Sequence, residues 1–105
     1  MASKTQISID LHAAQRLLAS LGSGTYRGDL GLEAGKALRV SDEALSMVSS
    51  LDLRGQLQRV QVTLRTLCVG GLVDREQCKQ AVYALHLVLV TEFRACRRTA
   101  EPVEA

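Results

Sequence analysis

Histidines, cysteines and paired carboxylates are the side chains of this 105-residue chain that could support catalysis or bind a metal. Its two histidines stand apart: His12 lies beside a predicted helix start, and His86 lies within an apolar stretch. A lone histidine in such a stretch is more often a hydrogen-bonded structural residue than a general base. The chain also lacks the motifs of zinc proteases, serine hydrolases, P-loop enzymes and dinucleotide-binding enzymes.

The carboxylate pairs and the cysteines have structural explanations as well. Asp42 and Glu43, like Asp74 and Glu76, stand at predicted helix starts, where the helix dipole favours negative charge. The cysteines are odd in number and form no Cys-x-x-Cys pair, and all three fall on apolar helical stripes, at Cys68, Cys78 and Cys96. This usage favours core packing in a reducing compartment over redox or metal chemistry. We therefore predict a protein that is not an enzyme and that has no cofactor or metal.

Composition and charge exclude further classes. Aromatic residues make up 3% of the chain, which argues against an RNA-stacking or carbohydrate-binding surface. The net charge of +2 is too weak to imply nucleic acid by itself. Lys4 is not followed by the continuous apolar core of a signal peptide. The longest apolar run, residues 81–90, is about half the length of a membrane span. We predict a soluble, cytoplasmic protein without membrane contact.

Two segments carry clear helical periodicity. The first covers residues 53–69 and has apolar residues at 4-3-4-3 spacing, namely Leu53, Leu57, Val60, Leu64 and Leu67. The second covers residues 75–97 and has a similar seam, formed by Cys78, Val82, Leu85, Leu89 and Cys96. Gly70 and Gly71 end the first helix, and Asp74 with Gln77 forms a capping box for the second. The short connection between the two helices predicts an antiparallel hairpin.

The segments before residue 53 predict two or three shorter helices. Residues 6–11 alternate polar and apolar side chains, which is typical of a strand, yet they also fit a helix lead-in capped by Asp10. A helix then runs to Gly22, followed by a glycine-rich loop over residues 22–29. Residues 30–39 fit a short helix whose glycines, Gly31 and Gly35, suit close approach of another helix.

A further helix is predicted from Ser41, which has the chemistry of an N-cap, to Leu51, and Asp52 is expected to cap the helix that follows. Together these elements predict one all-α domain over residues 1–105. The domain is a small bundle built on the long antiparallel hairpin, and residues 1–6 and 99–105 form disordered tails.

The last helix is apolar on more than one face, and this feature carries the functional prediction. A helix that is apolar all round must be surrounded, either by the helices at residues 10–21 and 41–51 of its own bundle or in part by another molecule. We predict a protein-binding module, such as an adaptor, inhibitor or chaperone-like regulator, that docks another protein or a second copy of itself as a dimer. The predicted interface consists of Ala84, Leu87, Val88, Val90, Arg94, Arg97 and Arg98.

A small DNA-binding regulator is the alternative prediction. Residues 4–11 followed by a helix resemble the start of the ribbon-helix-helix repressors, and the resemblance implies a dimer whose ribbon enters the major groove through Lys4, Gln6 and Ser8. The chain departs from that pattern at residues 22–31, where glycines replace a clean start of a second helix. A second route to DNA is a polar helix stripe that consists of Arg54, Gln58, Gln61 and Arg65.

Overall fold

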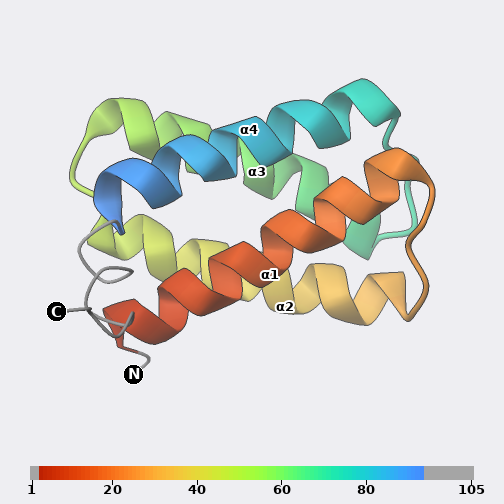
Figure 1. Cartoon of the computed structure of the whole chain (residues 1–105), viewed down its shortest axis with the longest axis horizontal. Coiled ribbons are helices and arrows are strands. Elements are labelled where there is room, and N and C mark those ends of the chain that lie inside the picture. Colours follow the sequence, from red (N-terminus) through yellow and green to blue (C-terminus); the bar gives the residue numbers. More distant parts are fainter. Residues whose placement is uncertain (1–2, 94–105) are drawn as a thin grey trace, which may run out of the picture.

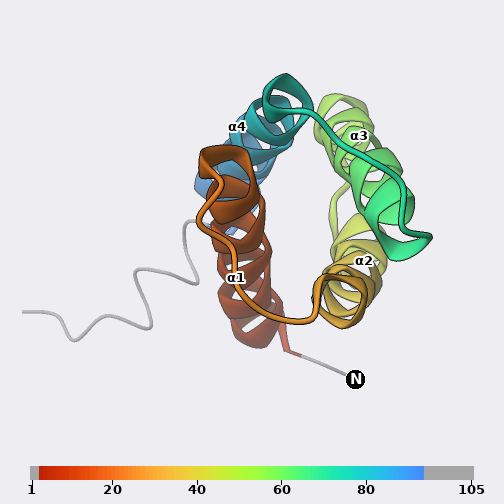
Figure 2. The same cartoon turned by 90° about the vertical axis from the view of Figure 1, so that its right-hand side faces the viewer.

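The computed structural model describes residues 3–93, which form four helices. In chain order these are α1 (Lys4–Ser23), α2 (Leu30–Met47), α3 (Leu51–Cys68) and α4 (Arg75–Glu92). Each helix packs on the next, and α4 packs back on α1, so the four helices close a ring around one core (Figure 1, Figure 2). The predicted all-α bundle with an antiparallel α3–α4 hairpin is confirmed.

Each helix starts where a short polar side chain replaces a missing backbone partner. The carboxylate of Asp74 accepts from the backbone N–H of Gln77, whose side chain accepts from the Asp74 N–H, so the predicted capping box is confirmed. The start of α3 differs from the prediction, because Ser50 rather than Asp52 is the N-cap. The remaining two N-caps are Ser3 and Asp29.

The first helix starts earlier than predicted. The Ser3 hydroxyl accepts from the Gln6 backbone N–H, and the helix runs without a break through residues 6–11. The strand interpretation of this segment is therefore wrong, as is the prediction that residues 3–6 belong to a disordered tail. The reason lies in the core: Ile7 and Leu11, four residues apart, are both buried on the same side of α1.

The second helix is one continuous element and not two short ones. Ser41 lies in its middle, buried on the core side, so its predicted role as an N-cap is wrong. A methyl group added at Gly35 would meet no atom within 4 Å, so this glycine does not serve a close helix approach. All four helices contain 18 to 20 residues, and the expected contrast between long and short helices is absent.

The core is built from unequal contributions. α3 buries its predicted seam completely at Leu57, Val60 and Leu64, and Leu85 and Val88 of α4 are equally inaccessible. The fully buried residues of α2 are small, namely Ala34, Ala37, Ser41 and Ala44, and its larger apolar residues, Leu30, Leu38, Val40, Leu45 and Met47, are only partly buried against the core. The helix that α4 forms ends at Glu92, short of the predicted end at residue 97, and residues 94–97 lie outside the described part of the chain.

Polar side chains of α3 hold α2 in place. The buried amide of Gln61 donates to the Ser41 hydroxyl at 3.0 Å and to the carboxylate of Asp42. Nearer the start of α3, the guanidinium of Arg54 donates to the backbone carbonyls of Leu45 and Val48, which lie at the end of α2. Because cations suit the carbonyl end of a helix, these bonds fix the α2–α3 connection.

Candidate functional site

The residues with catalytic potential do not assemble into a site. His12 is half-buried on α1, whereas His86 is exposed on α4. Burial raises the pKa of the Cys78 thiol, and the nearby Asp74 carboxylate raises it further, so this thiol is protonated at neutral pH and is a poor nucleophile. Within residues 3–93, no group of three or more His, Cys, Asp or Glu side chains could hold a metal ion. None of the four described helices is both long and apolar enough to cross a membrane.

Exposed apolar side chains distinguish one half of the molecule from the other. In the described residues, the first two helices expose two large apolar side chains, Ile9 and Leu32. The second half exposes six, at Leu51, Val62, Val69, Leu72, Tyr83 and Val90. We define the α3–α4 face as the outer surface that contains Leu51 and Val62 of α3, its C-cap Val69, and Tyr83, Leu87 and Val90 of α4.

Helical spacing places these residues opposite the core. Tyr83, Leu87 and Val90 recur every three to four residues along α4, on the side away from the buried Leu85 and Leu89. Leu51, Val62 and the C-cap residue Val69 are separated by about three and two turns on α3, and all three are exposed. The α3–α4 face therefore carries a closely spaced apolar row on α4 and separate apolar side chains on α3.

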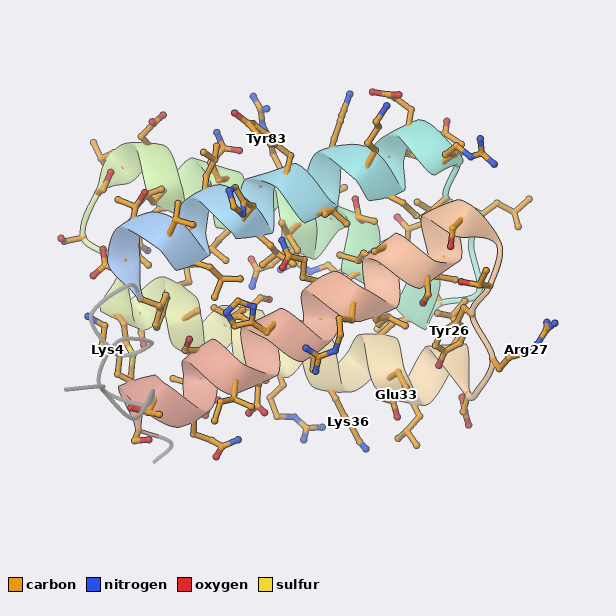
Figure 3. The ribbon with its side chains drawn as sticks, in the orientation of Figure 1. Lys4, Tyr26, Arg27, Glu33, Lys36 and Tyr83 are labelled. Carbon is orange, nitrogen blue, oxygen red and sulfur yellow. The ribbon has the colours of Figure 1, made fainter. Side chains whose placement is uncertain are left out.

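A groove lies between the two helices. Val62 and Tyr83 line it together and are 60% and 63% exposed. The rest of the lining is mostly polar, and consists of Gln56, Arg59, Thr63, Glu76, Gln77, Lys79, Gln80 and Ala81. Tyr83 extends from α4 away from α1 and α2, as Figure 3 shows. Because the ring of four helices is already closed, none of the described helices is left to cover this groove.

Cations outnumber acidic residues at the groove. Arg59 lines it from α3 and Lys79 from α4, and Arg65 is exposed one turn after Val62, outside the lining. Within the described residues the side chains of these three cations form no ion pair. The acidic residue of the groove is Glu76, which accepts from the Gln80 amide at 3.4 Å. The α3–α4 face thus combines exposed apolar side chains with a polar groove in which cations outnumber acidic residues.

The corresponding groove between α1 and α2 has a different character. Small side chains such as Ala13, Ala14 and Ala37 line it, together with charged residues of both signs. Lys36 and Glu33 form an ion pair across one turn of α2, with 3.7 Å between nitrogen and oxygen (Figure 3). This groove therefore exposes neither a large apolar side chain nor a single sign of charge.

The phenol of Tyr26 is a further unusual group at this end of the bundle. Its hydroxyl is buried and has no hydrogen-bond partner within the described residues. Burial raises the pKa of Tyr26, and the carboxylates of Glu33 and Asp29 raise it further. A side chain at Gly28 would collide with this hydroxyl, so the loop backbone itself closes over it.

The structure changes the predicted protein interface. Ala84 and Val88 are buried against the neighbouring helices, so the prediction that they form part of an exposed surface is wrong. The reason is that α4 packs against both α1 and α3, and this packing leaves neither side chain exposed. Leu87 is half-buried and Val90 is 39% exposed, and both belong to the α3–α4 face. The other predicted interface residues, Arg94, Arg97 and Arg98, lie outside the described residues.

The residues of the DNA-binding alternative do not share one surface. Lys4 forms an ion pair with Glu92 and lies over the ring of Phe93, whereas Ser8 is buried and Gln6 donates to Asp10. The polar stripe on α3 is divided, because two of its members bond to α2 and two are exposed. The inward pair is Arg54 and Gln61, and the exposed pair is Gln58 and Arg65.

Val62 and Tyr83 are the site residues that the sequence analysis missed. Their signal was present: each lies on the side of its helix opposite a 4-3-4-3 seam, a position where a polar residue is expected.

No family model matches the chain, and no curated protein or solved structure matches it.

Proposed function

We propose that the chain is a protein-binding module that docks another polypeptide against its α3–α4 face and performs no chemistry of its own. The observation that carries this proposal is the groove at the centre of that face, where Val62 and Tyr83 are exposed although the bundle is closed. Covering a side chain of this size with a partner contributes about 1.5–3 kcal/mol. Such a module would act as an adaptor, an inhibitor or a chaperone-like regulator.

Two further features support the proposal. Leu87 and Val90 extend the apolar surface along α4, so that a partner would find anchors over two turns of helix. Cys68 and Cys78 are free thiols, which agrees with a reducing compartment, and we propose the cytoplasm as the location.

Affinity capture with a matched pair of variants tests the proposal. Tyr83→Glu places a charge at the centre of the groove, and Leu32→Glu places the same charge on a comparably exposed residue of α2. We expect the wild-type chain and Leu32→Glu to capture the same protein from a lysate of the organism that makes the chain. Tyr83→Glu should lose that protein. A wild-type chain that captures nothing, or a partner retained by Tyr83→Glu, would contradict the proposal.

A further inference from the structure

The α3–α4 face has the shape and the apolar spacing that receive a helix. Two adjacent antiparallel helices leave a groove between them, and an amphipathic helix fills such a groove with side chains at positions i, i+3 or i+4, and i+7. Tyr83 stands on one wall of the groove and Val62 on the other. Leu87 and Val90 follow Tyr83 along α4 at that same spacing and extend the apolar surface beyond the groove. This inference rests on the proposed function and concerns the chemistry of the partner.

The charges around the groove select the kind of helix. From residue 53 to residue 73 the chain contains no acidic residue, and Arg59 and Arg65 are both exposed beside Val62. Lys79 adds a third cation from α4, and Glu76 offsets one of the three. Since opposite charges across an interface favour both encounter and register, this surface fits a partner with carboxylates at the edge of its apolar stripe.

A second copy of the chain fits the same surface poorly. Homodimers are mostly two-fold symmetric, so each residue near the axis faces its own copy. A two-fold axis through the centre of the groove, near Val62, would bring Arg59 and Arg65 toward the same residues of the other copy. Like charges in such positions disfavour association. We therefore propose that the α3–α4 face binds an amphipathic helix of another protein whose polar positions are acidic.

A displayed library of helical peptides tests the charge of the partner. Each peptide has the length of α3, 18 residues, with apolar residues fixed at helical spacing and the flanking positions randomised among acidic, basic and neutral side chains. We expect the wild-type chain to enrich peptides with Asp and Glu beside the apolar stripe. These peptides should bind at least about tenfold more weakly to Tyr83→Glu, a difference of about 1.4 kcal/mol.

Reversing the charges on α3 tests whether its arginines select the acidic peptides. The double variant Arg59→Glu with Arg65→Glu should invert the enrichment from acidic to basic peptides, whereas the control Arg39→Glu, an exposed position on α2, should leave it unchanged. Enrichment of neutral or basic peptides by the wild-type chain would overturn the inference, as would enrichment of no peptide at all.

Sedimentation velocity of the full chain tests whether a second copy of the chain occupies the α3–α4 face. We expect a monomer, for which Tyr83→Glu changes nothing. A dimer that Tyr83→Glu dissociates would overturn the inference, because the second copy would then be the occupant. Loss of a captured protein in Tyr83→Glu would still support the proposed function in any of these cases, so the failure of the inference and the failure of the function are distinguishable.

Discussion

The two halves of the bundle differ in where they place their large apolar side chains. In α2 the fully buried residues are three alanines and a serine, its larger apolar residues are only partly buried, and its outer side carries charges of both signs. In α3 leucine and valine fill the core-facing side, and Leu51, Val62 and Val69 are exposed on the outer side as well. The core-facing side chains of each half account for the fold. The exposed apolar side chains of α3 and α4 are not part of the core. Those residues therefore call for another explanation, and a partner provides one.

The largest expected effect is a loss of stability on truncating core side chains of the two halves. Leu64→Ala removes a fully buried side chain from the centre of α3 and should destabilise the protein by about 2–5 kcal/mol. Leu38→Ala on α2 should cost clearly less, because this side chain is only half-buried. Urea denaturation followed by circular dichroism measures both changes. Equal losses would show that α2 contributes as much to the core as α3, and the contrast between the halves would fail.

The polar connection between the halves should give the next largest effect. Gln61→Ala removes the amide that donates to Ser41 and Asp42 and should cost about 1–3 kcal/mol. A double-mutant cycle with Ser41→Ala isolates the bond, since the two substitutions should destabilise by less together than the sum of their separate effects. Strictly additive losses would mean that this bond does not couple α2 to α3.

Two glycine substitutions should give a smaller effect, of opposite sign. Gly35 in α2 and Gly55 in α3 lie inside helices, and an added methyl group would meet no atom within 4 Å at either position. Gly35→Ala and Gly55→Ala should therefore each stabilise the protein by about 0.5–1 kcal/mol, because alanine loses less backbone entropy in a helix. Thermal denaturation measures the gain. A loss at either position would reveal a close neighbour in solution that the present packing lacks.

The outer surfaces should give the smallest effect on stability. Tyr83→Glu and Leu32→Glu both alter exposed side chains, so each should change the free energy of unfolding by no more than about 0.5 kcal/mol. Urea titration of the two variants in parallel measures this. A large loss for Tyr83→Glu alone would mean that Tyr83 supports the fold, and the functional interpretation of the α3–α4 face would lose its basis.

The sequence predicts the second half of the fold better than the first. Around α3 and α4 the seams, the capping box and Gly70 are local signals that agree with one another, and the predicted bounds lie close to those observed at most ends. In α2 the local signal misleads, because Ser41 looks like an N-cap. Its actual partner, Gln61, lies twenty residues further along the chain, and local patterns carry no information about such a contact.

Part of the candidate site could be predicted from the sequence, and the rest depended on how the helices pack. Leu87 and Val90 were identified because α4 is apolar on several faces. Ala84 and Val88 were assigned to the surface because the packing of α4 between α1 and α3 could not be derived from the spacing alone, and this packing buries both residues. Val62 needed a different test, which asks for apolar residues opposite an established seam. That test depends only on helical spacing and could have been applied to α3 from the sequence alone.

Photo-crosslinking in the living cell tests the central claim most directly. A photoreactive phenylalanine analogue is placed at Val62 or Tyr83 on the α3–α4 face, and at Ile9 or Leu32 on the opposite half, where exposure is similar. The account predicts one crosslinked adduct of the same mass at positions 62 and 83, and none at positions 9 and 32. Equal crosslinking at all four positions, or adducts confined to the first half, would contradict it.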